Sequence, residues 1–580
     1  MRPTPTARHP VAVLIFAAYS SLAGYLAFVE PELSNQQVLI ATAAIKRHDV
    51  STFPHDPVLG DNRLWRFHTP VFQGLLELSL VPTGYADLSL PFRALAGVLL
   101  MVYLCGMYAL LYQQCRSWSI AALVAVLSSK VIEALGGGFW GAGTLACVTP
   151  MGICLAVTPL IVLAFLRYAG ASELRREPSG NGGRQAQWRL LLVFGGIGLL
   201  GNLHLVTAMN LTLVLLIAYL GRARFRAGSW GVALACGAAA LLGSLPHIMY
   251  FVMLRGLLQG PAAATAEAPI REALRVAGLE ALYPEMLKPM LRWLAYAAVV
   301  GAPSALLLFR SDRFRVTNGR LWGCLIVASL LLAIVLHGAT QVMAMLVRRS
   351  PPIIALLQAS ALAMLPLYVL AAQALTALFR LVQVNRWLLR WGCAVALVAW
   401  MLPSDNVQPL RHAAYEWATS FMEEQDKPLR VQELHAQAEA RRELRGLAAW
   451  ARGGPRGAVF ITDRVEFRML ARRSIVITRD DVGYYYYLAP GRLTKWIERL
   501  KRQARLLQKP GTIREFAGFR SLLSKRSTWA GAADWFVVLP ADPALPEAGG
   551  LEVPPHGRWG AHYRVYRVPA PPPEGSSPGT

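Results

Sequence analysis

Eleven long apolar segments fill most of the first 403 residues, and they restrict what this chain can fold into more than any other feature. They are residues 11–29, 91–112, 119–135, 147–167, 189–202, 205–221, 229–254, 291–309, 321–338, 353–379 and 387–403. Most are near the ~20 residues that a helix needs to cross ~30 Å of hydrocarbon. Only 16% of the 580 residues are charged, whereas a soluble protein has about 25%. The sequence therefore predicts a polytopic α-helical membrane protein with about eleven transmembrane helices.

The run at residues 190–220 is too long for one ordinary span and short for two. Arginines flank it on both sides, with Arg184 before it and Arg222 after it. If both ends face the side of the membrane that is rich in basic residues, the chain must turn back inside the run. We expect the turn at residues 201–204, with His204 at membrane depth near the outer face.

Arginine placement also predicts the orientation of the chain. The loops on the N-terminal side of the predicted bundle carry more Lys and Arg than the loops on the opposite side. Basic loops stay in the cytoplasm, so the N-terminus is expected inside. An odd number of crossings then places the chain after residue 403 outside the cytoplasm.

From Ser404 onward the composition changes, and no apolar run is long enough to span a membrane. Apolar stretches at residues 457–463, 473–478, 533–540 and 562–568 read as strands, and residues 431–453 and 488–508 read as helices. This alternation predicts a small α/β domain with a partly parallel sheet over residues 404–568. Residues 569–580 are rich in Pro, Gly and Ser and are expected to be disordered. The predicted core comprises Val459, Phe460, Ile461, Ile475, Val476, Ile477, Trp535, Phe536 and Val537.

The net charge of +24 does not indicate a nucleic-acid partner. Many of the arginines lie in short loops between apolar segments, and no nucleic-acid-binding module accompanies them. None of the seven cysteines follows residue 403. The C-terminal domain therefore has no disulfide, and the cysteines show no spacing typical of a zinc site.

A polar loop at residues 30–70 separates the first two spans and concentrates ionisable side chains. Glu30 and Glu32 directly follow the first span, and residues 34–45 read as a short amphipathic helix that could lie along the interface. A carboxylate beside the bilayer has a raised pKa, which suits a general base. The alternative is that these acids only mark the end of a helix in water.

The second half of this loop carries the parts of a phosphosugar or pyrophosphate site. Carboxylates and imidazoles can bind a divalent cation such as Mg²⁺ or Mn²⁺, and arginines can clamp a phosphate. The spacing matches no defined metal motif, and a hydrated loop with surface ion pairs is the alternative. The candidates are His55, Asp56, Asp61, Arg63, Arg66 and His68, next to Trp65 and Phe67.

Other positions invite two interpretations each. Arg348 and Arg349 lie at an outer interface, where they can meet a lipid phosphate or pair with an acid such as Glu285. Lys130 lies within an apolar segment, where charges often serve function, but Glu133 is three residues away and can neutralise it.

The four tyrosines at residues 484–487 form an unusual aromatic run. They can stack on a sugar or rest on the membrane. The alternative is an edge strand or an interdomain packing face.

Several of these stretches together resemble bacterial multipass proteins related to the GT-C glycosyltransferases. They are FPHDPVLGD…FHTPVF in the first outer loop, GIGLLGNLHLVTAMNLTLVLL at residues 196–216, and AVFITDRVEFRMLARRSIVITRDD at residues 458–481. The resemblance covers most of the membrane portion loosely. It implies an enzyme of the bacterial inner membrane that takes a sugar from a polyprenyl-phosphate-linked donor at the outer face.

Carried over by position, the family's acidic residue would be Glu32 or Glu30, with Asp56 and Asp61 as alternatives, and its phosphate contact would be Arg348 or Arg349. The chain departs from the family in having Glu-Pro-Glu in place of an adjacent acidic pair. It also has no acid in the next outer loop, GGGFWGAGT.

The competing hypothesis is a non-catalytic transporter or scaffold for envelope lipids or glycans. Transporters often carry inverted repeats and charges at the membrane midplane. This sequence shows no evident repeat and keeps most ionisable groups near the outer rim. The pattern therefore favours the enzyme.

Overall fold

A computed structural model describes most of the chain, and it divides the chain into two compact units. The first, here the helical unit, comprises Met1–Glu32, Ser89–Tyr250 and Leu282–Ala413. The second, here the mixed unit, comprises Leu33–Leu88, Phe251–Ala281 and Ala414–Thr580. The described residues are 8–29, 33–60, 64–130, 148–174, 181–258, 284–310, 316–346, 356–381, 386–509, 512–525, 529, 531–541 and 561–570.

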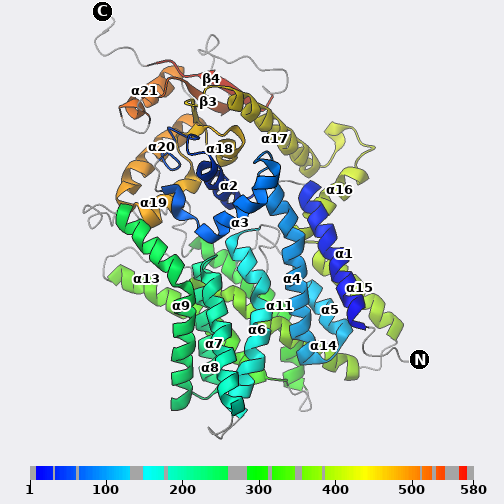
Figure 1. Cartoon of the computed structure of the whole chain (residues 1–580). Coiled ribbons are helices and arrows are strands. Elements are labelled where there is room, and N and C mark those ends of the chain that lie inside the picture. Colours follow the sequence, from blue (N-terminus) through cyan, green and yellow to red (C-terminus); the bar gives the residue numbers. More distant parts are fainter. Residues whose placement is uncertain are drawn as a thin grey trace, which may run out of the picture. The chain divides into compact units, whose positions relative to one another are not determined.

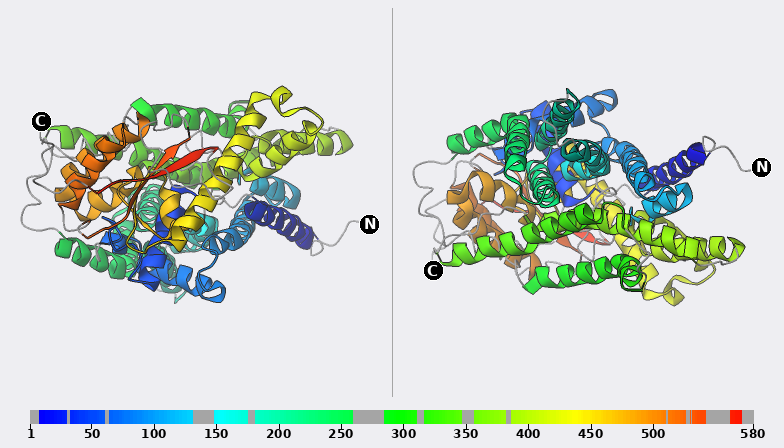
Figure 2. Two further views of the ribbon diagram at one scale, coloured as in Figure 1. Left: turned by 90° about the horizontal axis from the view of Figure 1, so that it is seen from above. Right: turned by 90° about the horizontal axis from the view of Figure 1, so that it is seen from below.

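The helical unit is built mainly from long apolar helices (Figure 1). Figure 2 shows the chain from two further directions. The helices are α1 (Arg8–Val29), α4 (Leu90–Cys115), α5 (Trp118–Leu127), α6 (Pro150–Leu174), α7 (Asn181–Gly201), α8 (Leu205–Arg222), α9 (Ala227–Leu258), α11 (Pro284–Arg310), α12 (Gly319–Leu330), α13 (His337–Leu346), α14 (Ser360–Leu381), α15 (Arg386–Met401) and α16 (Gln408–Ala418). Two of them cross the boundary, since α9 from Phe251 and α16 from Ala414 belong to the mixed unit. A π-helical turn, Leu331–Leu336, joins α12 to α13.

Every predicted span overlaps one of these helices. Within the described residues, seven helical segments are both long and apolar enough to cross a membrane. They are His9–Phe28, Leu90–Cys115, Pro150–Ala169, Leu205–Arg222, Ala227–Leu257, Gly319–Thr340 and Ser360–Arg380. The chain is thus a multi-pass helical membrane protein, whereas the number of eleven crossings and their orientation stay predictions.

The turn expected at residues 201–204 is confirmed, because α7 ends at Gly201 and α8 begins at Leu205. Asn202 in this turn bonds to the backbone of α9 twice. Its Nδ2 donates to the carbonyl of Gly243 at 2.8 Å, and its Oδ1 accepts from the N–H of His247 at 3.1 Å. In an uninterrupted helix that N–H and that carbonyl would bond to each other. The amide therefore bridges the helix at Pro246, where the ladder is broken.

Small residues let α7 and α9 approach closely beside this bridge. A Cβ on Gly198 would lie 2.2 Å from the carbonyl oxygen of Ala240, and one on Gly243 would lie 2.7 Å from that of Gly195. The Ser244 hydroxyl donates to the carbonyl of Gly198 at 3.0 Å. Close backbone contact of this kind is typical of helices that associate within a membrane, where no hydrophobic force drives them together.

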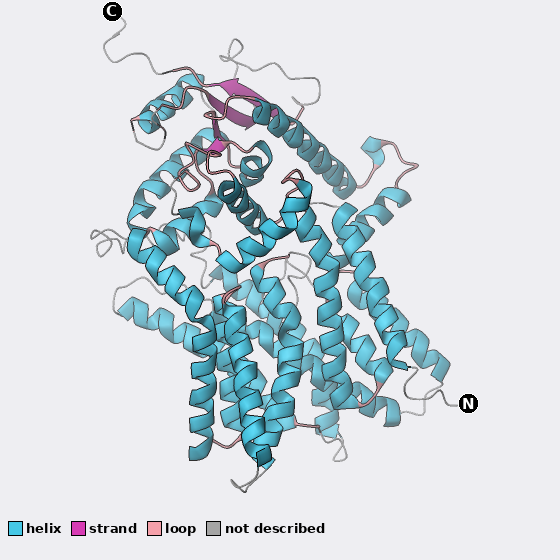
Figure 3. Cartoon of the chain, viewed as in Figure 1, coloured by secondary structure: helices cyan, strands magenta, loops and turns pink. Residues whose placement is uncertain are grey.

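The mixed unit holds all four strands that the structure describes (Figure 3). Its helices are α2 (Asn35–His48), α3 (Pro70–Leu80), α17 (Leu429–Gly453), α18 (Val465–Ala471), α19 (Val482–Leu488), α20 (Leu493–Gln508) and α21 (Ile513–Ser524). Its strands are β1 (Val459–Ile461), β2 (Ser474–Ile475), β3 (Trp535–Pro540) and β4 (Tyr563–Arg567). The first loop after α1 thus belongs to the same unit as the C-terminal region, an association that the sequence did not predict.

The sheet has the strand order β2-β1-β3-β4. β1 pairs in parallel with β2 and β3, whereas β4 is antiparallel to β3. The partly parallel sheet predicted from the sequence is confirmed. Each predicted strand segment contains one observed strand, because short apolar runs bounded by turn residues are typical of buried strands.

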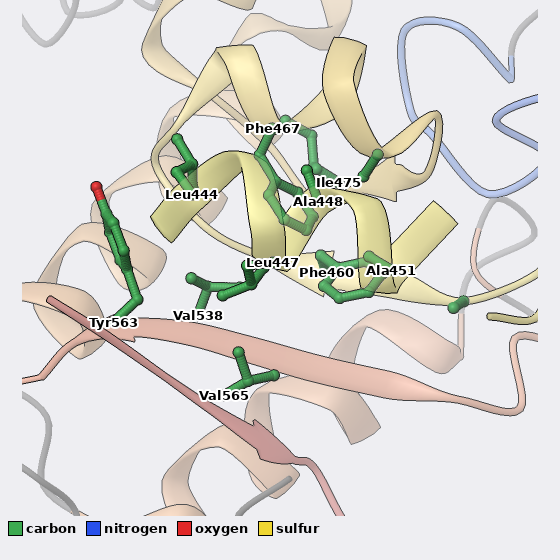
Figure 4. Packing of buried hydrophobic residues seen from close by; sticks show 12 residues of the cluster. Leu444, Leu447, Ala448, Ala451, Phe460, Phe467, Ile475, Val538, Tyr563 and Val565 are labelled. Carbon is green, nitrogen blue, oxygen red and sulfur yellow. The ribbon is translucent and has the colours of Figure 1, made fainter. Parts of the chain in front are cut away.

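The core of the mixed unit forms where α17 and α18 pack on the sheet (Figure 4). Leu444 and Leu447 of α17 meet Phe460 of β1, and Phe467 of α18 packs on Phe460 with ring centroids 4.9 Å apart. Of the nine residues predicted to form the core, all are buried except Phe536, which is half-buried.

Candidate functional site

Asp56, a candidate for catalysis, lies fully buried in the mixed unit. Its Oδ2 lies 2.9 Å from Nε of Arg468, whose side chain is also inaccessible to solvent. The other side of this guanidinium binds Asp481 with two hydrogen bonds, of 2.7 Å from Nη1 and 2.9 Å from Nη2. One arginine thus joins two carboxylates in the interior.

The remaining acceptor sites of both carboxylates are used by the backbone. Asp56 accepts from the N–H groups of Val58 and Leu59 at 3.0 Å each, and Ile475 N donates to its second oxygen at 3.3 Å. Asp481 caps a short turn by accepting from the N–H of Thr478 at 2.9 Å. The network therefore fixes the first loop to strand β2.

Burial raises the pKa of Asp56, and the guanidinium of Arg468 opposes this effect. Burial would lower the pKa of Arg468, but the carboxylates of Asp481 and Asp56 outweigh it and raise that pKa. Because no oxygen of Asp56 reaches solvent, its role in this structure is to hold the loop in place.

His68 and Phe67, at the other end of the same loop, contact the tyrosine run. The ring of His68 makes a 2.8 Å hydrogen bond with the hydroxyl of Tyr484, and Phe67 stacks on Tyr487 with centroids 5.4 Å apart. Burial lowers the pKa of His68 to about 4, so the imidazole is neutral at physiological pH.

The tyrosine run forms helix α19, not an edge strand. Tyr484 and Tyr485 are buried, and Tyr486 and Tyr487 are half-buried. Of the interpretations offered from the sequence, these contacts favour the packing face.

The other described candidates of this loop, His55 and Arg66, each make separate contacts. His55 is half-buried, and its N–H donates to the Ser474 hydroxyl at 3.1 Å. Arg66 is exposed, with its guanidinium 5.5 Å from the centroid of the Trp65 ring. Among the described residues, no group of three or more His, Cys, Asp and Glu side chains is placed to hold a metal ion. The positions Glu30, Glu32, Asp61, Arg63, Arg348 and Arg349 lie outside the described residues.

His204 has a local role in the helical unit. It is the N-terminal cap of α8, since its Nδ1 accepts from the N–H of Thr207 at 3.3 Å and lies 2.7 Å from the hydroxyl of the same residue. Side chains that satisfy the first N–H groups of a helix stabilise its start. The turn between α7 and α8 therefore accounts for this histidine.

Lys130 occupies the most distinctive environment in the helical unit. It is 6% exposed and directly follows the two serines that end the α5 region. Its ammonium lies 4.1 Å from the centroid of the Trp400 ring and 5.6 Å from that of Tyr296. These two rings stack on each other with centroids 4.9 Å apart. Aromatic faces carry negative charge and attract a cation, so the two rings form a cage around Lys130.

Hydroxyl groups extend this cage. Tyr296 and Tyr368 share a 2.7 Å hydrogen bond between their hydroxyls. Tyr103 donates to the Ser128 hydroxyl at 3.1 Å, next to the cage. The rings come from α4, α11, α14 and α15, so four helices that are distant in sequence build one environment.

The depth of Lys130 follows from its neighbours. Ser128 bonds to Tyr103 and Ser129 to Tyr19, and these tyrosines lie near the middle of α4 and α1. At 1.5 Å per residue, Tyr103 is about 20 Å from the first residue of α4. A charge halfway along spanning helices is costly to bury and points to function.

The sequence suggested that Glu133 neutralises Lys130, but Glu133 lies outside the described residues. Among the described side chains, the ammonium contacts aromatic faces, which leave its N–H donors for an anion. This environment, which we call the Lys130 cage (Lys130, Tyr296, Tyr368 and Trp400), suits a phosphate or carboxylate of a lipid-soluble ligand.

No protein-family model matches the chain, and no curated protein matches it significantly. The functional assignment therefore rests on the residues and on their geometry.

Proposed function

We propose that this chain is a membrane glycosyltransferase that uses a polyprenyl-phosphate-linked sugar, and that Lys130 binds the donor phosphate. One observation carries the proposal: a buried ammonium lies at mid-height among apolar helices, on the faces of Trp400 and Tyr296. A lipid-linked phosphate is an anion that can reach such a site by way of the bilayer. The proposed location is the outer face of a bacterial inner membrane, in accord with the arginine distribution.

The proposed reaction is an inverting displacement. The acceptor hydroxyl attacks the anomeric carbon, a carboxylate takes its proton, and the bond from that carbon to the phosphate oxygen breaks. The electron pair leaves with the lipid phosphate, whose charge increases as it departs. An ammonium in a water-poor site stabilises that developing charge.

Glu32 and Glu30 follow the end of α1, whereas Lys130 lies near its middle, so the proposal of these residues as the carboxylate rests on the resemblance alone. Asp56 is the less suitable base because Arg468 and three backbone N–H groups occupy its oxygens. Arg348 and Arg349 are proposed as further phosphate contacts. A divalent cation, Mg²⁺ or Mn²⁺, is proposed as a cofactor from the carboxylates and imidazoles of the polar loop at residues 30–70.

The test is sugar transfer by the full chain in phospholipid nanodiscs, with labelled polyprenyl-phosphate sugars as donors. Lys130→Met should lower kcat/KM by about 100-fold or more, since it removes a charge that acts on the leaving group. Glu32→Gln should lower kcat by about 10²- to 10⁴-fold. Lys427→Met is the control, because Lys427 is a half-buried lysine of the mixed unit that pairs with Glu424 and is no part of the Lys130 cage.

Retained transfer in Lys130→Met, with Lys427→Met as the reference, would refute the assignment of the phosphate site. A parent protein that binds polyprenyl phosphate without transferring any sugar tried would favour the transporter or scaffold hypothesis instead.

A further inference from the structure

A short turn connects α15 to α16, and hydrogen bonds hold its conformation. Arg411 Nη1 donates to the carbonyl of Leu402 at 2.6 Å, just after the end of α15. The N–H of Ser404 bonds to the carbonyl of Met401 at 2.8 Å, and Asn406 Nδ2 donates to the Ser129 carbonyl at 2.7 Å. The start of α16 is thereby tied to the end of an apolar helix.

One side of α16 is apolar and exposed. Leu410 and Trp417 are seven residues apart, so they lie on the same helix face, with Ala414 between them. Phe421 follows Trp417 by four residues, in the turn after the helix. Leu410 is 50% exposed, Trp417 80% and Phe421 83%. We call Leu410, Trp417 and Phe421 the α16 stripe.

The polar residues of α16 lie away from this stripe. Glu416 is 3.8 Å from the Nε2 of His435 on α17, and His435 also binds Glu424 at 2.7 Å. These contacts use the polar side of α16. The opposite side is apolar, and on it Trp417 and Phe421 are the two most exposed large apolar side chains among the described residues.

The exposed face of α15 bears on what kind of surface would cover the stripe. Val395, Val398 and Leu402 are each more than half exposed, and their spacing places them on one face of α15. An apolar helix in a multi-pass membrane protein presents such a face to lipid. The first stripe residue, Leu410, comes eight residues after Leu402, across the turn that Arg411 fixes. The exposed apolar residues of α15 are therefore followed along the chain by those of α16.

We infer that α16 is an interfacial helix whose stripe inserts into the membrane surface next to α15. Tryptophan suits this position because its ring is apolar and its N–H can bond to water or headgroups. Arg411, at the start of the helix, is positively charged and lies near the phosphate groups of the lipids. The inference does not depend on glycosyl transfer.

Hydroxyl-radical footprinting of the full chain in single-copy nanodiscs tests it. The nanodiscs contain phosphatidylethanolamine, phosphatidylglycerol and a small fraction of a phospholipid with a photoreactive diazirine near the acyl carbonyl. Because an interfacial helix buries its apolar face about 5–10 Å into the headgroup boundary, oxidation of Trp417 and Phe421 should be roughly tenfold slower than their exposure implies. Tyr415 lies off the stripe on the same helix, is 47% exposed, and is the internal control.

Photolysis should attach the lipid to the peptide that contains Trp417 and to the peptide of α15, which serves as the positive control. Oxidation of Trp417 and Phe421 at the rates that their exposure implies would overturn the inference. So would protection without a lipid adduct on that peptide while α15 is labelled, because the stripe would then be covered by protein.

Discussion

Replacing Asp56 with asparagine should destabilise the mixed unit by about 3–5 kcal/mol, because it leaves the buried charge of Arg468 with one partner instead of two. Both side chains are inaccessible to solvent, so water cannot replace the lost carboxylate. Asparagine keeps the shape and one acceptor oxygen for the N–H groups of Val58 and Leu59. The Asp481 pair also remains. We therefore expect a value near the lower end, about 3 kcal/mol.

Hydrogen exchange of the full chain in nanodiscs, read by mass spectrometry, measures this effect. The reporter is the N–H of Val476, which bonds to the carbonyl of Phe460 at 2.9 Å in the sheet. Where exchange proceeds by opening of the unit, lowering the free energy of unfolding by about 3 kcal/mol accelerates amide exchange by roughly 150-fold, since 1.4 kcal/mol corresponds to tenfold. The amides of α4 should exchange as in the parent.

Asp463→Asn is the matched control, because Asp463 pairs with Arg464 at 3.8 Å and both side chains are more than half exposed. An exposed pair contributes about 0–1 kcal/mol, so exchange should change by no more than about fivefold. Replacing Asp56, Asp481 and Arg468 together by uncharged residues of similar volume should recover part of the loss. Equal effects of Asp56→Asn and Asp463→Asn would refute the argument from desolvation.

Three further predictions concern separate parts of the chain. The free energy of unfolding of the mixed unit should fall by roughly 3 kcal/mol as the pH is lowered from 6.5 to 4. The reason is that the pKa of His68 is about 4 in the folded unit, below its unfolded value, so the unfolded state binds more protons than the folded state in this range. The loss should appear in hydrogen exchange and be absent in His68→Gln; the same pH profile in that variant would contradict the assignment. Asn202→Ala should lower the thermal stability of the helical unit by about 1–2 kcal/mol, since it removes the two bonds to the α9 backbone; an unchanged melting temperature would contradict this role. A reporter fused after Pro403 should be active outside the cytoplasm and one within residues 170–188 inside, and the reverse pattern would mean that the crossings were miscounted.

The strands and long helices were predictable because their signals are local. β1 and β3 are short apolar runs bounded by charged or turn residues, and α17 has the spacing of an amphipathic helix. The turn before α8 was predictable from the arginines on either side of an overlong apolar run. In each case a window of about 20 residues contains the evidence that determines the element.

The placement of the first loop was not predictable, because its partners are distant in sequence. Asp56 meets Ile475 across 419 residues. Within the loop, a carboxylate for catalysis and a carboxylate for a buried ion pair have the same residue type and similar neighbours. The one local signal was the motif RMLARRSIVITRDD, in which basic and acidic residues flank an apolar run that needs a buried partner.

Two kinds of charge in this chain therefore carry different information about function. In the polar loop, charged residues are frequent, and folding can pair them, as Arg468 pairs Asp56. In the apolar helices charged residues are rare, and Lys130 has aromatic faces around it instead of a carboxylate among the described side chains. Burial of an ammonium is unfavourable unless an anion pairs with it, so binding of an anion would stabilise a site that contains a buried ammonium. For this reason the Lys130 cage, more than the crowded loop, is where a substrate anion is expected to bind.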